Sequence, residues 1–427
     1  MRDDLPFGRV LRELRQRKRL SQKVLGDLTA LSVRAIRDLE AGRVQRPREQ
    51  TVRLLANGLQ LVGPQRKAFE AAAYETAPDP TARDGIPGAG WTSPPAFSGP
   101  FIGREAEAAI LTELLTTDAE QVISVVGVAG VGKTRLVSEV SKVILRQSDW
   151  RVVWLSSHET IASHMDTYEL YAPSKLLSLG SGEDSRSGDM SKVLVVLDGA
   201  SGGSARFLTE LLRQVPRPHV LITARAPLGL PRELVFPVGP LAVPTLDKEL
   251  KDLTANPSVR LLLWHLRRVS PWFQLRDDNA VAVARLCWLL DGLPRALELG
   301  AAMCTMRSPQ RLVDQLIDQP HAIRDWRSSV GSGELLLSSL EESLSLLRGA
   351  EQALLEPLAS SGGVWSLDEA AAAAELACAD AIEHMELLVR CGLVRHNRAV
   401  GEPRFSLLNL VRTAHCGARS GHTPARR

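Results

Sequence analysis

Eight residues, Gly127–Thr134 (GVAGVGKT), have the types and the spacing of a phosphate-binding loop. They follow the apolar run Val122–Val126, which predicts a buried strand, and they precede a helix-forming stretch. Glycines let backbone N–H groups turn toward phosphate oxygens, and a helix N-terminus adds partial positive charge. We expect Lys133 to reach the β- and γ-phosphates and the Thr134 hydroxyl to ligate Mg²⁺. A glycine turn before an ordinary helix is the alternative, and the lysine and threonine in register disfavour it.

A second apolar run, Val193–Asp198, ends in a carboxylate. Ligands of parallel sheets bind at the carboxyl ends of the strands, so we expect Asp198 to complete the Mg²⁺ site with Thr134 and to act in catalysis. Active ATPases often place an acidic residue next to polarise water. This chain has Gly199 there. ATP or ADP binding is therefore expected, with slow hydrolysis at best.

A third apolar run, His219–Arg225, ends in an arginine. Arg225 is able to sense a γ-phosphate if its strand ends beside the phosphate loop. An arginine on its own is more often a surface residue. Its place as the third motif in an ordered series favours the functional interpretation.

The N-terminal region carries a different chemistry, because residues 1–53 hold fourteen Lys and Arg against seven Asp and Glu. Its charge is therefore +7, and 3 − 7 leaves −4 on the rest of the chain. The apolar spacing predicts a helix over Phe7–Lys18 and two further helices with Ser21 and Ser32 as their N-caps. The short connection between those two helices is typical of a helix-turn-helix.

The phrase LSQKVLGDLTALSVRAIRDLEAGR resembles the Cro/phage-repressor-like (XRE) helix-turn-helix family, over residues 7 to about 75. In such modules the third helix faces the major groove, where arginine can read guanine and valine can touch a thymine methyl. A solvated ion pair between Arg34 and Asp38 is the alternative interpretation. Ala30 replaces the family's usual turn glycine, which predicts a slightly rebuilt turn. The DNA-binding residues that we expect are Val33, Arg34 and Asp38 at base edges, and Gln22, Arg37 and Arg43 at phosphates.

Five segments in order, FIGRE from Phe101, the phosphate loop, LVVLD, LITAR and GLP from Gly292, resemble the NB-ARC domain of the STAND class of signal-transduction ATPases. The resemblance covers roughly residues 99–415. It implies a parallel-sheet nucleotide domain, a helical subdomain and a winged-helix subdomain that close on the nucleotide. The nucleotide-binding residues that we expect are Gly103, Arg104, Gly127, Val128, Ala129, Gly130, Val131, Gly132, Lys133, Thr134, Arg135, Arg225 and Pro294.

Two departures from this family concern the nucleotide. Arg295 stands where the family's GLPL motif has leucine, which predicts altered packing there. The family's Met-His-Asp motif, whose histidine holds the β-phosphate of ADP, aligns with Leu407–Asn409, so the histidine is absent. We therefore expect ADP to be held less firmly, or by another group such as Arg412 or His415.

Length and composition fit about three globular domains, since 427 residues with 44% hydrophobic content can form about three cores. The resemblances imply that the fold is multidomain α and α/β. Five scattered cysteines without a C-x-x-C pair predict reduced thiols in a cytoplasm. No signal segment or long apolar run is recognised, so no membrane is expected. The domains that we expect are a helix-turn-helix domain in 1–75, a flexible linker in 76–98, a P-loop nucleotide domain in 99–245, a helical subdomain in 246–325, a winged-helix subdomain in 326–418 and a tail in 419–427.

These motifs together predict a cytoplasmic transcriptional regulator whose DNA-binding module is governed by an ATP/ADP switch. Its expected partners are double-stranded DNA, a second copy of itself on activation, and an unidentified signal or protein. The alternative is a nucleotide-switched assembly scaffold whose N-terminal module binds protein. A metabolic ATPase is least favoured, because no catalytic carboxylate follows Asp198.

Overall fold

The structure is a computed structural model that forms two compact units, Met1–Gly88 and Ala89–Arg427. Each unit is described by itself below. The residues that the structure describes are 11–12, 14–16, 18, 20–29, 31–40, 49–59, 69, 94–117, 121–147, 150–156, 192–214, 219–245, 250–326, 336–361, 363–397 and 403–420.

The first unit contains α2 (Gln22–Thr29), α3 (Val33–Glu40) and α4 (Glu49–Gly58). Both predicted N-caps are confirmed, because the hydroxyls of Ser21 and Ser32 each accept a hydrogen bond at 3.1 Å from the backbone N–H three residues later. Only part of the helix predicted over Phe7–Lys18 is described, and the predictions for Ala30 and Arg43 lie outside the described residues. The buried apolar side chains of this unit are Leu11, Leu25, Ile36, Leu39, Val52, Leu55, Ala56, Leu59 and Phe69.

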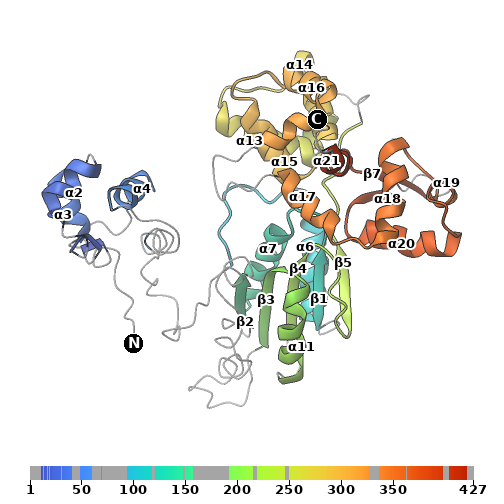
Figure 1. The fold of residues 1–427 in the computed structure, drawn as a ribbon, viewed down its shortest axis with the longest axis horizontal. Coiled ribbons are helices and arrows are strands. Elements are labelled where there is room, and N and C mark those ends of the chain that lie inside the picture. The colour runs from blue at the N-terminus through green and yellow to red at the C-terminus, as the bar shows by residue number, and fades with distance from the viewer. Residues whose placement is uncertain are drawn as a thin grey trace, which may run out of the picture. The chain divides into compact units, whose positions relative to one another are not determined.

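The second unit is built on a five-stranded sheet in the order β2-β3-β4-β1-β5, and every neighbouring pair is parallel (Figure 1). The three apolar runs of the sequence form its inner strands β3, β4 and β1, which confirms the predicted parallel sheet. Inner strands of a covered parallel sheet are buried on both faces, which explains their continuous apolar sequence. The strands are β1 (Val122–Val126), β2 (Trp150–Ser156), β3 (Lys192–Ala200), β4 (His219–Ala224) and β5 (Glu233–Pro237).

Helices cover both faces of this sheet. Successive side chains of a strand point to opposite faces, and the neighbours Val196 and Leu197 of β3 accordingly belong to different apolar clusters. Val196 lies in the cluster of α6 (Glu105–Thr116) and α7 (Lys133–Leu145), and Leu197 lies in the cluster of α11 (Ala205–Gln214). The chain therefore forms the three-layer arrangement in which a ligand binds at the carboxyl ends of the strands.

A helical layer follows the sheet in sequence and lies at one end of it (Figure 1). Three of its α-helices begin with proline in the first turn, where the missing N–H costs no hydrogen bond. Within this layer α13 packs on α15, and α14 packs on α16. Its elements are α12 (Leu250–Ala255), α13 (Pro257–Val269), α14 (Asp277–Leu289), α15 (Pro294–Met303), α16 (Pro309–Asp318) and the 3₁₀ helix η2 (Pro320–Asp325).

The last part of the chain has the helices and the hairpin of a winged helix. Strands β6 and β7 pair antiparallel, and Trp365 bridges to Phe405 beside them. This arrangement agrees with the fold that the resemblance implied. The elements are α17 (Leu336–Ser345), α18 (Gly349–Ser361), α19 (Leu367–Ala373), α20 (Cys378–Arg390), β6 (Val394–Asn397), β7 (Arg404–Leu407) and α21 (Asn409–Ser420). Among the helices described, none has the length and apolar character needed to cross a bilayer.

Candidate functional site

The predicted phosphate loop connects β1 to α7 in the structure. Its glycines Gly130 and Gly132 have φ of +76° and +101°, a left-handed backbone that side chains rarely tolerate. Lys133 is the first residue of α7, so the helix N-terminus opens onto the loop. The loop therefore presents backbone N–H groups and a helix dipole at one place, as phosphate binding requires.

Lys133 is turned back onto the loop that precedes it. Its Nζ donates to the carbonyl oxygens of Gly127 at 2.7 Å and Val128 at 2.9 Å. Burial, and after it the positive charge of Arg225, lower the pKa of Lys133 to about 7, and the carboxylate of Asp198 opposes the shift. An anion bound beside this ammonium group would restore its charge, so the site is electrostatically suited to phosphate.

Asp198 lies at the carboxyl end of β3, where a hydroxyl from each side donates to the same carboxylate oxygen. Thr134 Oγ1 is 2.8 Å from Asp198 Oδ1, and Thr223 Oγ1 is 2.6 Å from it. The Thr223 hydroxyl in turn accepts from the backbone N–H of Gly199 at 2.8 Å. The structure thus brings the predicted pair Thr134 and Asp198 together.

Thr223 is a site residue that the sequence analysis missed. It is buried within β4, next to β3 in the sheet. The available signal was a polar residue near the end of an otherwise apolar strand, two positions before Arg225. Its role follows from the geometry, since it fixes the orientation of the Asp198 carboxylate.

The residues present fit a magnesium ion. Mg²⁺ prefers oxygen donors and is commonly held by one or two carboxylates together with phosphate oxygens. Thr134 and Asp198 supply a hydroxyl and a carboxylate at hydrogen-bond distance from each other. Among the described residues no group of three or more His, Cys, Asp or Glu could form a self-sufficient metal site.

Arg104 connects the segment before α6 to the phosphate loop. It is buried, and its Nη2 donates to the carbonyl oxygens of Val131 at 2.8 Å and Gly239 at 2.7 Å. Burial lowers its pKa, and the carboxylate of Glu107 opposes the shift. Gly103 is left-handed, and a side-chain carbon there would lie 2.5 Å from Pro257 Cβ. The predicted pair Gly103 and Arg104 therefore packs tightly between the loop and α13.

Arg135 binds the segment that leads into the domain. Its Nη2 donates to the Gly99 carbonyl oxygen at 2.8 Å, and its guanidinium lies 5.1 Å from the ring centre of Phe97. Ser138 donates to the carbonyl oxygen of Pro95 at 3.0 Å. The last residues of the predicted linker 76–98 thus lie along α7, and Phe97 lines the cavity described below.

Two later parts of the chain close on the loop. From α15, the backbone N–H of Arg295 donates to the Gly130 carbonyl oxygen at 3.2 Å, and a side-chain carbon at Gly132 would be 3.7 Å from Pro294 Cγ. From the winged helix, a side-chain carbon at Gly392 would lie 3.5 Å from the backbone nitrogen of Val128. Arg295, which replaces the family's leucine, keeps this contact through its backbone.

These elements enclose a cavity of about 1160 Å³. Small-molecule sites usually measure roughly 300–1,000 Å³, so a nucleoside triphosphate fits. Its walls combine apolar and aromatic side chains, among them Phe101 and Trp264, with residues of the phosphate loop. The predicted site residues that line it are Arg104, Ala129, Gly130, Gly132, Lys133, Thr134, Arg135, Arg225 and Pro294.

The segment aligned with the Met-His-Asp motif lies in the core. Leu407 and Leu408 are buried, and Asn409 Nδ2 donates to the carbonyl oxygen of Trp288 at 3.0 Å. Arg412 and His415 are not among the described residues that line the cavity. The structure thus places these candidates for an ADP lock away from the cavity wall.

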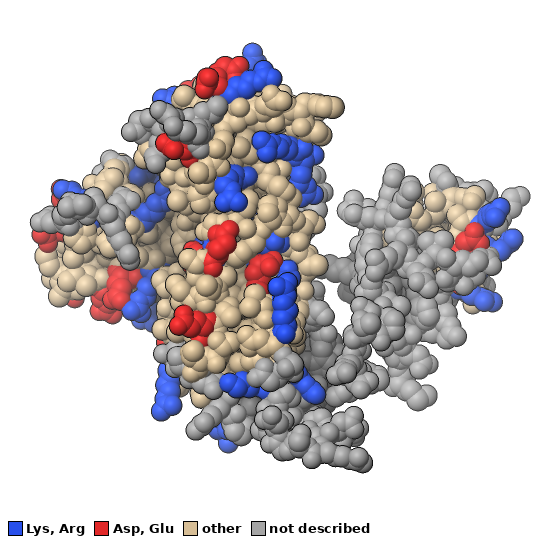
Figure 2. Space-filling model, turned by 180° about the vertical axis from the view of Figure 1, so that it is seen from behind, with Lys and Arg blue, Asp and Glu red and all other residues tan. Residues whose placement is uncertain are grey.

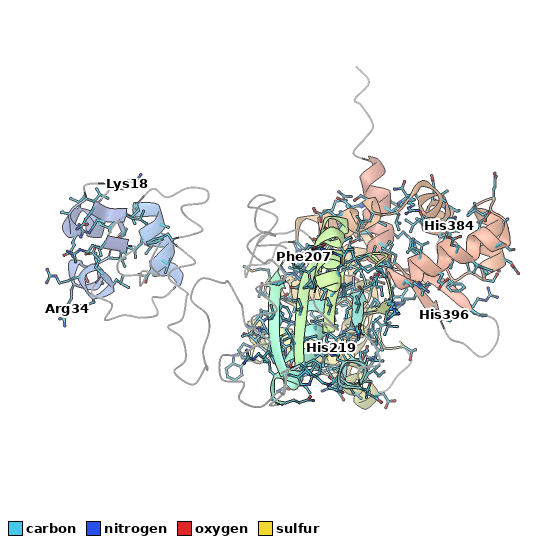
Figure 3. The ribbon with its side chains drawn as sticks, turned by 90° about the horizontal axis from the view of Figure 1, so that it is seen from below. Lys18, Arg34, Phe207, His219, His384 and His396 are labelled. Atoms are coloured by element: carbon cyan, nitrogen blue, oxygen red, sulfur yellow. The ribbon has the colours of Figure 1, made fainter. Side chains whose placement is uncertain are left out.

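The predicted DNA-binding residues of the helix-turn-helix unit differ in how exposed they are. Arg34 and Arg37 on α3 are exposed, and Figure 3 shows Arg34 extending from the surface of this unit. Asp38 is half-buried. The side chain of Val33 lies outside what the structure describes, as does Arg43.

Gln22 contributes to the interior of this unit. Its Nε2 donates to Glu40 Oε2 at 2.7 Å, and Arg15 donates to both oxygens of the same carboxylate at 2.6 and 3.0 Å. Burial opposes ionisation of Glu40, but these hydrogen bonds outweigh it and lower its pKa. One N–H of the Gln22 amide thus links α2 to α3, and the second donor of that nitrogen leaves the predicted phosphate contact a prediction.

Comparison with known proteins gives these two units a context. Residues 6–69 match a family described as a helix-turn-helix domain, and residues 100–222 match one described as an AAA ATPase domain. Both predicted resemblances, a helix-turn-helix and a downstream ATPase domain, are thereby confirmed. The uncharacterized protein Rv0894 of Mycobacterium tuberculosis is 30% identical over 285 residues, which are 64% of this chain and 68% of that protein.

The chain belongs to the family of Rv0894. Another relative in Mycobacterium tuberculosis, "Putative HTH-type transcriptional regulator Rv0890c", is 30% identical over 228 residues, which are 52% of this chain and only 25% of that longer protein. Among solved structures, the STAND protein with a tetratricopeptide repeat sensor PH0952 from Pyrococcus horikoshii is 16% identical, with a TM-score of 0.28 over 79% of this chain and 48% of that one.

Proposed function

We propose that this chain is a cytoplasmic transcriptional regulator of the STAND type, which binds DNA through its helix-turn-helix and is switched by ATP and ADP. The observation that carries the proposal is the closure of α15 and the winged helix on the phosphate loop, through Arg295 and Gly392. A bound nucleotide in that loop would contact parts of the chain that are far apart in sequence. Its phosphates can therefore bias how these parts pack.

In this proposal Lys133 and the loop N–H groups bind the β- and γ-phosphates, and Thr134 and Asp198 hold Mg²⁺. The ion would neutralise phosphate charge. Thr223 orients the Asp198 carboxylate, and Gly199, which has no side chain, leaves the attacking water without a carboxylate. The nucleotide site is therefore built to bind and signal, with slow turnover.

The charges of the two units agree with DNA binding by the first unit rather than the second. On the face in Figure 2, acidic and basic side chains of the ATPase unit are interspersed rather than gathered by sign. The sequence places its +7 excess in residues 1–53. A polyanion such as DNA is therefore a better partner for the first unit than for the second. The name of Rv0890c supports the same proposal.

The test combines nucleotide binding with DNA binding on the full chain. Lys133→Ala should lower the affinity for ATP by at least about tenfold, which is roughly 1.4 kcal/mol of binding free energy. Operator DNA from a random-library selection should bind with an affinity that falls steeply with salt and differs between ATP and ADP. Nucleotide-dependent assembly without salt-dependent DNA binding would instead support an assembly scaffold. Unchanged ATP affinity in the Lys133 variant would show that the phosphate loop is not the nucleotide site.

A further inference from the structure

An ion pair joins the end of β4 to α17 inside the nucleotide cavity. Arg225, which directly follows β4, donates to the carboxylate of Glu342 on α17, although 117 residues separate them. Both residues line the cavity. The side chains keep 24% and 60% of their exposure, so a dissolved anion can reach the pair.

The guanidinium of Arg225 belongs electrostatically to the phosphate site. Its positive charge is the largest effect, after burial, among those that depress the pKa of Lys133. Lys133 and Arg225 also line the same cavity, so one bound anion can contact both. The Glu342 carboxylate therefore supplies the negative charge that Arg225 would otherwise take from a bound phosphate.

Helix α17 connects this ion pair with the rest of the molecule. Its buried face includes Leu336, Leu337 and Leu340, and the helix packs against α21. Leu336 also reaches the phosphate loop, because its Cδ1 would be 3.3 Å from a side-chain carbon at Gly130. A change at Glu342 thus acts on a helix that contacts both the phosphate loop and α21, the last helix of the winged-helix part.

We propose that Glu342 occupies the γ-phosphate position of Arg225, so that a triphosphate displaces the carboxylate and loosens α17 while a diphosphate leaves the ion pair intact. This inference rests on the proposed nucleotide-binding function. It assigns to Glu342 the discrimination between ATP and ADP. It also assigns to α17 the transmission of that difference to α21 and the rest of the winged-helix part.

The neighbouring glutamate provides a matched control. Glu341 is on the same helix and pairs with Arg324 at 2.8 Å, but it does not line the cavity. Partly exposed ion pairs are worth up to about 1 kcal/mol, or about fivefold in affinity. Glu342→Gln should therefore raise the affinity for a non-hydrolysable ATP analogue about two- to fivefold and change the affinity for ADP by less than about twofold. Glu341→Gln should change neither.

Calorimetry on the full chain with Mg²⁺ measures these affinities. If Glu342→Gln leaves the ATP-to-ADP affinity ratio at the wild-type value while Lys133→Ala still weakens ATP binding as expected, the inference is wrong and the proposed function stands. Failure of the wild-type chain to bind either nucleotide overturns both. In an Arg225→Gln background, Glu342→Gln should lose its effect, and a persisting effect would contradict competition for Arg225.

Hydrogen exchange gives a second readout that does not depend on affinity. Amides of Leu336–Ser345 should exchange faster with the ATP analogue than with ADP in the wild type. In Glu342→Gln they should exchange faster even without nucleotide, and in Glu341→Gln they should match the wild type. Equal protection of α17 with both nucleotides at saturation would overturn the proposed release.

Discussion

Asp291 in the helical layer caps the helix that begins at Asn409, since its Oδ2 accepts from the backbone N–H of Leu410 at 2.8 Å. Asp291 is buried, has a left-handed backbone at φ +56°, and lies three residues before Pro294 at the phosphate loop. Arg395 on β6 donates to its backbone oxygen. One short turn therefore links the nucleotide loop to the start of α21.

This relationship predicts a pH-dependent contribution to stability. Burial raises the pKa of Asp291 to about 6, although the Arg395 charge and backbone hydrogen bonds oppose the shift. Between about pH 4 and 6 the folded state holds a proton that the unfolded state has lost, so this group makes the free energy of unfolding fall as pH rises. Asp291→Asn should flatten that part of the pH profile in chemical denaturation.

Removal of the cap itself should be costly. Asp291→Ala should lower the free energy of unfolding by about 1–2 kcal/mol, because the backbone N–H of Leu410 loses its acceptor. Asp291→Asn keeps an acceptor and is the matched control. Equal losses in the two variants would show that the contact with α21 contributes nothing.

The lowered pKa of Lys133 predicts proton uptake on nucleotide binding. With a pKa of about 7, the Lys133 amine of the nucleotide-free protein is mostly neutral at pH 8 and mostly charged at pH 6. Phosphate binding should restore the charge, so uptake should approach about one proton at pH 8 and vanish near pH 6. Calorimetry in buffers of different ionisation enthalpy measures it. Lys133→Arg, which stays charged, should take up no proton at either pH.

Thr223 should govern the metal dependence of binding. Thr223→Val keeps the side-chain shape but removes the hydrogen bond to Asp198. The affinity for the Mg²⁺-nucleotide complex should fall about tenfold, because hydrogen bonds to charged groups contribute about 1.5–3 kcal/mol. Nucleotide without metal should bind as before. The exposed Thr209, which bonds only within α11, offers Thr209→Val as a control. Equal weakening with and without Mg²⁺ would argue for a general packing defect.

Arg34 and Arg43 should affect DNA binding differently. Arg34→Ala should lower the binding free energy on the preferred DNA sequence by about 1–3 kcal/mol and relax the sequence preference, because an exposed arginine on α3 can reach base edges. Arg43→Ala should weaken all sequences alike, as loss of a phosphate contact does. Gel-shift competition separates the two effects. If specificity survives Arg34→Ala, this residue is only a solvated surface charge.

Hydrolysis should be far slower than the roughly 10 s⁻¹ typical of enzymes. Gly199 has a left-handed backbone at φ +78° and occupies the position after Asp198 where a carboxylate would polarise water. Steady-state phosphate release by the full chain measures the rate. A turnover near that typical value would reveal a catalytic base elsewhere in the chain.

Local sequence determined the parts of this protein that depend on neighbouring residues. Continuous apolar runs predicted the inner strands β1, β3 and β4, because strands buried on both faces need apolar side chains on both. The glycines of the phosphate loop reported its left-handed backbone directly. Serine caps marked the starts of α2 and α3. Asp198 could be placed beside Thr134 because inner strands of a parallel sheet end at one edge.

Only the tertiary structure decided which distant polar groups meet. Glu342 and Asp291 carry no local pattern that marks them, and Thr223 is marked only as a polar residue in an apolar strand. The partners of all three lie 25 to 119 residues away. The same holds for the hydrogen bond from Gln22 to Glu40, whereas the DNA-phosphate contact that the family resemblance implied for Gln22 stays a prediction. Periodicity fixes which face of an element is buried, whereas the pairing of polar groups across elements depends on how those faces pack. That packing is a property of the whole chain.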